Sequence, residues 1–247
     1  MERRNDGFHD LETLFLPAYG LCDILEIVES DVLSMKTYGI SYDGDPMDDL
    51  CVKAYRAVER RRSLPPVEIC LHKMIPVGAG LGGGSSDASF VIRGLNEMFG
   101  LKLSVEEMIE AAAEVGSDCP FFILNEPAYA EGRGEKLELF SGESVRSLAE
   151  DYEIRFRFPG LHISTKEAYG GITPRKKKGG VFPDDDLKAV LNGPVASWKG
   201  VLVNDFEEVA FRMYPEIAQI KEDFYRQGAV YASMTGSGSA VFGFFKK

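Results

Sequence analysis

The stretch Pro76-Val77-Gly78-Ala79-Gly80-Leu81-Gly82-Gly83-Gly84-Ser85-Ser86-Asp87-Ala88 places five glycines within seven consecutive positions and follows them with two serines. Glycine lets the backbone approach a ligand closely and turn its N–H groups inward, because no Cβ is in the way. Before this run, residues 67–73 alternate apolar with mostly polar side chains, which predicts a half-buried strand. After it, a helix is predicted to begin near Ser85, with an apolar stripe formed by Ala88, Val91, Ile92, Leu95 and Phe99. A strand, a glycine loop and a helix N-terminus in this order are typical of an anion-binding cradle.

Three other interpretations of the glycine run fit less well. Gly78-x-Gly80-x-x-Gly83 matches the dinucleotide fingerprint, which needs an acidic residue about twenty positions on, at the end of a second strand. Here that position is Met98, and the neighbouring Glu97 lies within the expected helix. A Walker P-loop is excluded because no Gly-Lys-Ser/Thr closes the run, and a Gly/Ser linker would not lead directly into a periodic amphipathic helix. The run therefore predicts a phosphate-binding loop.

Length, charge and cysteine content describe an ordinary globular protein. The 247 residues are 45% hydrophobic, enough for one large or two small domains with a substantial core. The formal net charge of −11 disfavours nucleic-acid and anionic-membrane partners, although a local nest of amides and a metal ion still allow ATP to bind. Four separated cysteines without a Cys-x-x-Cys pair indicate reduced thiols. No apolar run approaches the roughly 18 residues of a membrane span, and no signal-peptide core is present, so we expect a cytoplasmic protein.

The first part of the chain mixes strand and helix patterns. Residues 11–16 and 23–28 are expected to pair as strands, with a helix over about 48–61 covering their apolar side chains. A capping box at 104–107 marks the start of another helix. The apolar run 121–124 is expected to be a buried strand.

The second part of the chain begins near residue 151. It is predicted to contain a strand at 152–158, helices near 186–191, 204–214 and 215–226, and a final strand pair at 230–234 and 240–245. Helices and strands are interspersed without strict βαβ alternation. We therefore expect an α+β protein with domains at 1–150 and 151–247.

The full pattern Pro-x-x-x-Gly-Leu-Gly-Gly-Gly-Ser-Ser closely resembles the phosphate-binding motif of the GHMP small-molecule kinases, which include galactokinase, homoserine kinase and mevalonate kinase. The resemblance implies an N-terminal domain like domain 2 of ribosomal protein S5 and a ferredoxin-like C-terminal domain. It also implies phosphoryl transfer from Mg²⁺-ATP to a small alcohol. By this resemblance, one of two serines, Ser85 or Ser86, lies near Mg²⁺, and the ATP phosphates are held by Pro76, Gly78, Gly80, Leu81, Gly82, Gly83, Gly84, Ser85 and Ser86.

Asp118 is the candidate catalytic residue. It lies between the end of a helix and an apolar run, where a rigidly held carboxylate could orient an alcohol and accept its proton. An aspartate that caps local loop amides would give the same pattern. The segment Gly-Ser-Asp-Cys-Pro-Phe-Phe at 116–122 closely matches the segment with the catalytic aspartate in one branch of the GHMP kinases, which acts on 4-diphosphocytidyl-2-C-methylerythritol. The resemblance therefore implies that Asp118 is catalytic.

Residues near the start of the chain also resemble that branch. Asn-Asp-Gly-Phe-His-Asp-Leu-Glu-Thr at 5–13 is similar to the branch pattern Asp-Gly-Tyr-His-x-Leu-x-Thr, with Phe8 in place of the tyrosine. The resemblance implies that Phe8 and His9 bind the cytosine of the substrate, through a stacking face and hydrogen bonds. Taken alone, a Phe-His pair before a strand is ordinary core or surface.

Two later segments extend the resemblance. In the stretch 159–169, Tyr169 is implied to close on the cytosine, although it could equally pack on a helix face. The stretch Met-Thr-Gly-Ser-Gly-Ser-Ala at 234–240 resembles a third family motif, a glycine turn beside the phosphate loop, which implies that Gly236 and Ser237 contact the substrate. A plain hairpin turn would look similar.

The start of the chain departs from the family pattern. Relatives begin with a further strand carrying Ala-Lys-x-Asn-Leu, whose lysine pairs with the catalytic aspartate, whereas this chain starts at Met1-Glu2-Arg3-Arg4. We expect this strand to be missing, an edge of the sheet to lie unpaired, and Asp118 to lack a neighbouring cation. Asp49 also stands where relatives often have asparagine on the adenine side.

The resemblance implies an ATP-dependent kinase for the 2-hydroxyl of 4-diphosphocytidyl-2-C-methylerythritol, a step of non-mevalonate isoprenoid synthesis. Its partners would be small molecules rather than nucleic acid or membrane, and it would be a monomer or weak homodimer. Two alternatives stay open. The chain could be a truncated, noncatalytic nucleotide-binding protein, or a GHMP kinase that acts on another alcohol such as homoserine or mevalonate.

Overall fold

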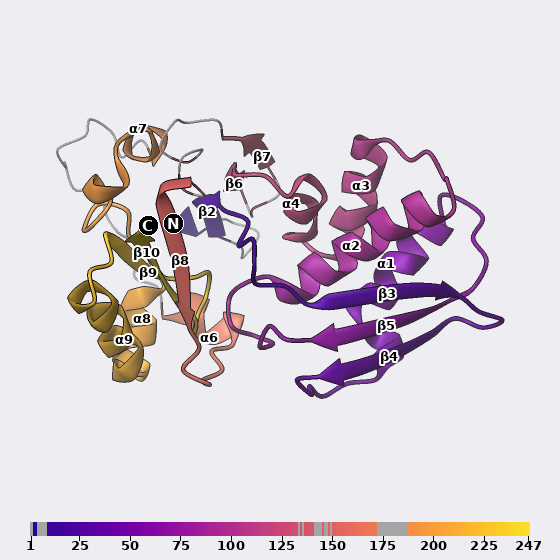
Figure 1. Cartoon of the computed structure of the whole chain (residues 1–247), viewed down its shortest axis with the longest axis horizontal. Coiled ribbons are helices and arrows are strands. Elements are labelled where there is room, and N and C mark those ends of the chain that lie inside the picture. Colours follow the sequence, from indigo (N-terminus) through magenta and orange to yellow (C-terminus); the bar gives the residue numbers. More distant parts are fainter. Residues whose placement is uncertain are drawn as a thin grey trace.

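The strand and helix expected on either side of the glycine run form as β5 and α2, and they organise the first half of the molecule (Figure 1). The computed structural model describes residues 2–3, 9–132, 134, 136–140, 145, 148, 150–171 and 187–247. Its strands are β1 (Glu2–Arg3), β2 (His9–Phe15), β3 (Ile24–Glu29), β4 (Ser34–Gly39), β5 (Val67–Lys73), β6 (Ala128–Gly132), β7 (Lys136–Leu139), β8 (Tyr152–Arg157), β9 (Tyr231–Met234) and β10 (Val241–Lys246). Its α-helices are α1 (Leu50–Glu59), α2 (Gly83–Met98), α3 (Val105–Val115), α4 (Cys119–Leu124), α6 (Thr165–Gly170), α7 (Leu187–Asn192), α8 (Glu207–Met213) and α9 (Pro215–Arg226), and two short 3₁₀-helices are η1 (Pro46–Asp48) and η3 (Val195–Ser197).

The first sheet has the order β3-β5-β4, with β5 antiparallel to β3 and parallel to β4. Alternate side chains of β5 are buried, as the sequence pattern predicts for a strand with one covered face. Helices α1, α2 and α3 lie over that face in Figure 1, and their apolar stripes share one core with the strands. The glycine run therefore leaves a rigid strand and enters a rigid helix.

The other two sheets are antiparallel. One has the order β1-β2-β6-β7, and the other has the order β8-β10-β9, against which α8 and α9 pack. A third core cluster joins Leu14 of β2 and Leu16, just after this strand, to Trp198 and Phe244 from the second part of the chain. The two parts of the chain therefore share buried apolar surface.

Two expectations for the first part of the chain are wrong. The segments 11–16 and 23–28 do not pair, because β2 lies between β1 and β6, whereas β3 pairs with β5. Their apolar residues belong to different cores, so they lie in different sheets. The run 121–124 belongs to helix α4, because Pro120 occupies the first helical turn, where its missing N–H costs nothing. Helix α2 also begins two residues before Ser85, at Gly83.

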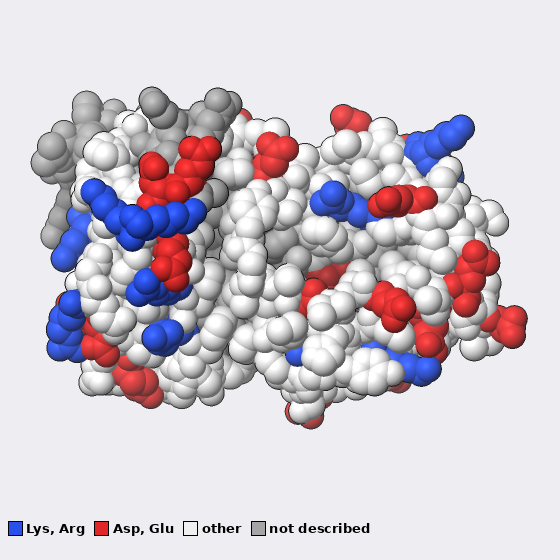
Figure 2. Space-filling model, in the orientation of Figure 1, with Lys and Arg blue, Asp and Glu red and all other residues white. Residues whose placement is uncertain are grey.

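The final strand pair, helix α9 and the capping box of Ser104 with Glu107 form as predicted. Among the described residues, no helix is long and apolar enough to cross a membrane. Acidic and basic side chains are interspersed on the face drawn in Figure 2.

Candidate active site

The glycine run forms a tight loop at the N-terminus of α2. Gly78, Gly80 and Gly82 have φ angles of +72°, +77° and +65°, a region that residues with a Cβ rarely adopt. Gly82 is the N-cap residue, and no side chain caps the helix. The N–H groups of the first turn are therefore available to an anion, and the helix dipole favours negative charge there.

A second glycine turn, residues 235–239, lies directly against this loop. Thr235 Oγ1 donates a hydrogen bond of 3.0 Å to the carbonyl oxygen of Gly80, and the amide of Ala240 donates one of 3.1 Å to the carbonyl oxygen of Ala79. A Cβ added to Gly80 would lie 2.2 Å from the carbonyl oxygen of Thr235. The structure thus brings Gly236 and Ser237 beside the loop, and their contact with substrate stays a prediction.

Asp118 lies at the start of α4, next to the first turn of α2. Ser89 Oγ is 2.8 Å from the carbonyl oxygens of both Ser85 and Cys119, which fastens α4 to α2. The ring of Phe122 packs against Gly82, since a Cβ there would lie 3.0 Å from it. These contacts hold the start of α4, and with it Asp118, beside the loop. The side chain of Asp118 does not cap its own helix.

The carboxyl of Asp118 reaches solvent but is closely surrounded by protein. Burial raises its pKa above the ordinary value, although a hydrogen bond of 3.3 Å from Ser117 Oγ opposes the rise. No lysine or arginine in the described part of the chain forms an ion pair with it. The arrangement describes a solvent-accessible carboxylate that can take up a proton more readily than a free aspartate.

Tyr169 faces the same region from α6. Its half-buried ring packs edge-to-face on Phe206, with ring centroids 4.9 Å apart. Burial raises the pKa of the Tyr169 hydroxyl, and the negative charge of Asp118 raises it further, so the two side chains are electrostatically coupled. The side chain of His9, the first residue of β2, and the whole of Phe8 lie outside the described residues.

A buried charged cluster lies under the phosphate loop, and the sequence patterns above did not single it out. Lys73 Nζ contacts Asp23 Oδ2 at 2.5 Å and Asp87 Oδ2 at 2.7 Å, with all three side chains almost fully buried. The amides of Met74 and Ile75 donate to Asp23 Oδ1, so this residue also fixes the chain that leads into the loop. A Cβ on Gly83 would lie 3.1 Å from Lys73 Nζ, which places the ammonium directly beneath the first turn of α2.

The two carboxyls of this cluster titrate differently. Burial raises the pKa of Asp87 to about 7, against the pull of Lys73. Burial acts in the same direction on Asp23, but hydrogen bonds from Lys73 and from two amides outweigh it and lower its pKa. For Lys73, burial acts to lower the pKa, and the two carboxyls raise it. Lys73 could have been found from the sequence, because it occupies an inward position of β5 after Val67, Ile69 and Leu71.

Two other residues lie near the glycine loop. A Cβ on Gly78 would lie 2.5 Å from Nδ1 of His162, which is an exposed residue. No sequence pattern predicted that His162 lies beside the loop. Asp49 caps α1 by accepting a hydrogen bond of 2.8 Å from the amide of Cys51, and it also accepts one of 2.7 Å from the Tyr42 hydroxyl. The carboxylate of Asp49 is therefore engaged in local structure.

Family models match both parts of the chain. The model described as "GHMP kinases N terminal domain" matches residues 49–126, and "GHMP kinases C terminal" matches residues 187–247. A protein of Azobacteroides pseudotrichonymphae called 4-diphosphocytidyl-2-C-methyl-D-erythritol kinase is 46% identical over 99% of this chain and 88% of its own length. A protein of Bacteroides thetaiotaomicron with the same name is 45% identical over 99% of this chain and 86% of its own length.

Solved structures agree with this result. A crystal structure of 4-(cytidine 5'-diphospho)-2C-methyl-D-erythritol kinase superposes with a TM-score of 0.72 at 32% identity, covering 98% of this chain and 83% of that chain. Homoserine kinase from Cytophaga hutchinsonii superposes with a TM-score of 0.69 at 16% identity, covering 91% of this chain and 76% of that chain, which shows the shared fold alone. With its glycine loop, its aspartate at the start of α4 and these relatives, the chain belongs to the GHMP kinase family.

Proposed function

We propose that this protein transfers the γ-phosphoryl group of ATP to the 2-hydroxyl of 4-diphosphocytidyl-2-C-methyl-D-erythritol, a step of non-mevalonate isoprenoid synthesis. The observation that carries the proposal is the fastening of Asp118 to the phosphate loop through Ser89 and Cys119. It supports the proposal because α4, whose N-cap residue is Asp118, is held against the first turn of α2 beside the glycine loop. The substrate is inferred from relatives of that name at 46% and 45% identity.

The loop would bind the ATP phosphates through the amides of residues 78–86, with the α2 dipole supplying partial positive charge. Mg²⁺ supplies charge neutralisation between the phosphate oxygens when it is bound. Among the described residues, no group of three or more His, Cys, Asp or Glu could hold a metal ion. The hydroxyl of Ser85 or Ser86 would offer Mg²⁺ an oxygen ligand, the type of donor that this ion prefers.

Asp118 would orient the substrate hydroxyl and accept its proton. The hydroxyl oxygen attacks the γ-phosphorus, the bond to the β-phosphate oxygen breaks, ADP leaves, and the hydroxyl proton passes to the carboxylate. The raised pKa of Asp118, caused by burial, suits a residue that must hold this proton. Most of the acceleration would come from positioning and from charge stabilisation by the loop amides.

Phe8, His9 and Tyr169 would bind the cytosine, and Gly236 and Ser237 would border the transferred phosphate. Tyr169 supports this placement, because its hydroxyl is coupled to Asp118 while its ring is held by Phe206. An aromatic ring fixed in this way offers a stacking face for a pyrimidine. We further propose that the domains meet near residues 150 and 151, and that the protein acts in the cytoplasm as a monomer or weak homodimer.

One observation favours a noncatalytic nucleotide-binding protein as the alternative. No cation pairs with Asp118 in the part of the chain that the structure describes. A neighbouring positive charge would keep the carboxylate ionised and help to position the hydroxyl. The alternative predicts that ATP binds and that no phosphate is transferred.

A coupled assay of ADP release, run with the cytidine substrate, homoserine and mevalonate, tests the proposal. We expect turnover only with the cytidine substrate. Asp118→Asn should lower kcat by about 10² to 10⁴ and leave the Kd for ATP, measured by calorimetry, within about threefold. Turnover of homoserine or mevalonate instead would refute the substrate assignment, and ATP binding without turnover of any alcohol would favour the alternative.

A further inference from the structure

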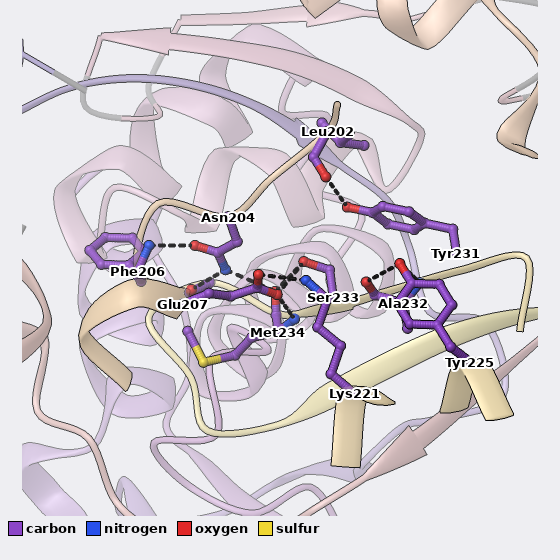
Figure 3. Close-up of polar contacts among 11 residues, drawn as sticks. Leu202, Asn204, Phe206, Glu207, Lys221, Tyr225, Tyr231, Ala232, Ser233 and Met234 are labelled. Carbon is purple, nitrogen blue, oxygen red and sulfur yellow. Dashed lines mark hydrogen bonds and ion pairs between the residues drawn. The ribbon is translucent and has the colours of Figure 1, made fainter. Parts of the chain in front are cut away.

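A buried carboxylate in the C-terminal part of the chain carries an unexplained set of contacts (Figure 3). Glu207, the first residue of α8, is 4% exposed. Its Oε1 accepts hydrogen bonds from the Met234 amide at 2.9 Å and from Ser233 Oγ at 3.1 Å, and its Oε2 contacts Lys221 Nζ at 2.6 Å. One side chain thus ties α8 and α9 to the end of β9.

Asn204 holds the next residues in the same way. Its Nδ2 donates to the carbonyl oxygens of Met234 and Gly236, both at 2.8 Å, and its Oδ1 accepts a hydrogen bond of 2.9 Å from the Phe206 amide (Figure 3). Asn204 therefore fixes the backbone on both sides of Thr235. Glu207 fixes the same backbone at the amide of Met234, the residue before Thr235.

Thr235 passes this constraint to the phosphate loop. Its hydroxyl donates to the carbonyl oxygen of Gly80, and its own carbonyl oxygen lies so close to Gly80 that a Cβ would not fit. Turn 235–239 contains Gly236 and Gly238, which leave the unfastened backbone many conformations. The clamp adds to the turn's own hydrogen bonds, which run from the Thr235 amide to Ala240 and from the Gly238 amide to Thr235. A shape fixed before binding avoids the entropy of ordering the loop around its ligand.

Stability alone does not require the ion pair of Glu207 with Lys221, in which the carboxylate is buried and the ammonium is partly exposed. Replacing a buried ion pair with packed hydrophobic residues is often neutral or stabilising. The contact of Glu207 with Lys221 therefore leaves room for a positional role, and the backbone hydrogen bond that the Glu207 carboxylate accepts comes from Met234, the residue just before the turn. The directional contacts specify where the turn lies.

We propose that Glu207 and Asn204 are positioning residues that hold turn 235–239 against the phosphate-binding loop and thereby set the affinity of the loop for ATP. The inference rests on the proposed function, because it takes residues 78–86 as the site of the ATP phosphates. Both positioning residues act through the backbone of the turn and through Thr235.

A double-mutant cycle tests this chain of contacts. Asn204→Ala removes the clamp, and Thr235→Val removes the hydrogen bond to Gly80. We expect each variant to raise the Kd for ATP, measured by calorimetry, and the KM for ATP by about tenfold, and to leave the KM for the cytidine substrate within about twofold. Because both changes break the same path, the double variant should also lose about tenfold rather than about a hundredfold. Thr235→Ser keeps the hydroxyl and should restore the wild-type affinity.

Tyr225→Phe is the matched control. It removes the two hydrogen bonds between the Tyr225 hydroxyl and the backbone of Ala232 in β9, and neither bond involves a residue of the turn (Figure 3). It should lower the melting temperature without changing the affinity for ATP. If Asn204→Ala fails to fold, Thr235→Val and Thr235→Ser still test the contact.

The outcomes separate this inference from the proposed function. Unchanged ATP affinity in both Asn204→Ala and Thr235→Val, or losses that multiply in the double variant, would overturn the inference. A wild-type chain that binds ATP but phosphorylates no alcohol would refute the proposed function alone, because the Kd comparison still decides the inference. A wild-type chain with no measurable ATP affinity would refute both.

Discussion

Gly80→Ala tests whether the phosphate loop and turn 235–239 are as tightly packed as the structure describes. The added Cβ would lie 2.2 Å from the carbonyl oxygen of Thr235 and 2.9 Å from two backbone atoms of Gly238. Backbone cannot rotate away as a flexible side chain can, so the turn must move. Two hydrogen bonds cross this contact, from Thr235 to Gly80 and from Ala240 to Ala79.

The chain offers a matched control for the backbone strain. Gly80 and Gly200 both have a φ of +77°, but a Cβ on Gly200 would meet no atom within 4 Å. Left-handed backbone costs a residue with a Cβ about 1–2 kcal/mol, so Gly200→Ala should lower the free energy of unfolding by that amount. Gly80→Ala should lose the same and a further 1–3 kcal/mol or so, because each crossing hydrogen bond contributes about 0.5–1.5 kcal/mol.

Urea unfolding measures the two stabilities, and calorimetry measures the affinity for ATP. We expect Gly80→Ala to weaken ATP binding at least about tenfold, a loss of roughly 1.4 kcal/mol, and Gly200→Ala to leave it unchanged. Equal stabilities and equal ATP affinities in the two variants would refute the reasoning, since they would mean that the loop has room for a Cβ.

Three further predictions concern the charged cluster and the substrate side. Lys73→Met leaves Asp23 and Asp87 buried without their cation, so it should lower the free energy of unfolding in urea by about 3–5 kcal/mol. The control Lys36→Met breaks an exposed ion pair and should lower it by less than about 1 kcal/mol. Similar losses in the two variants would contradict a stabilising role for Lys73 in the buried cluster. Burial raises the pKa of Asp87 to about 7 from 3.8, so its contribution to stability is complete below about pH 4 and is lost as the pH rises through 7. Asp87→Asn should flatten this decline in unfolding free energy measured from pH 4 to 8, and an unaltered slope would show that Asp87 does not titrate there. Tyr169→Ala should raise the KM for the cytidine substrate about tenfold or more in steady-state assays, because stacking on the ring is lost. Tyr169→Phe keeps the ring and should leave this KM nearly unchanged. Equal changes of KM in the two variants would rule out stacking.

The central strand, loop and helix could be predicted because their signals are local. The alternation in residues 67–73 and the apolar stripe after Ser85 each report which face is buried, and the structure confirms both elements. The pairing of segments 11–16 and 23–28 could not be predicted in the same way. Strand periodicity shows that one face is covered but not which core covers it, and these two strands face different cores.

Short apolar segments were the other source of error. Residues 121–124 are apolar without a period long enough to separate strand from helix. The deciding signal was Pro120, which is favourable in the first turn of a helix. Its position also determines where Asp118 lies, at the N-cap of α4.

The candidate site was predicted best where it is made of backbone. The glycine loop and the aspartate were found from sequence, and the structure places both at one end of α2, whereas their roles remain predictions. Asp23 and His162 were missed because each acts across a long sequence separation, with no repeat or motif around it. Lys73 was within reach, since a lysine on the covered face of a strand requires buried partners.

The hydrogen bond from Thr235 to Gly80 joins residues 155 positions apart, which links the nucleotide site to the order of folding. Strand β5 and helix α2 can form from neighbouring segments early in synthesis, but the loop between them gains its contacts with Thr235 and Ala240 only after the last part of the chain has been made. A nascent chain that ends before turn 235–239 would therefore contain the glycine loop without the turn that packs against it. ATP affinity in this protein should consequently report that the C-terminal strands have folded, and ATP itself would stabilise the completed molecule over every shorter intermediate.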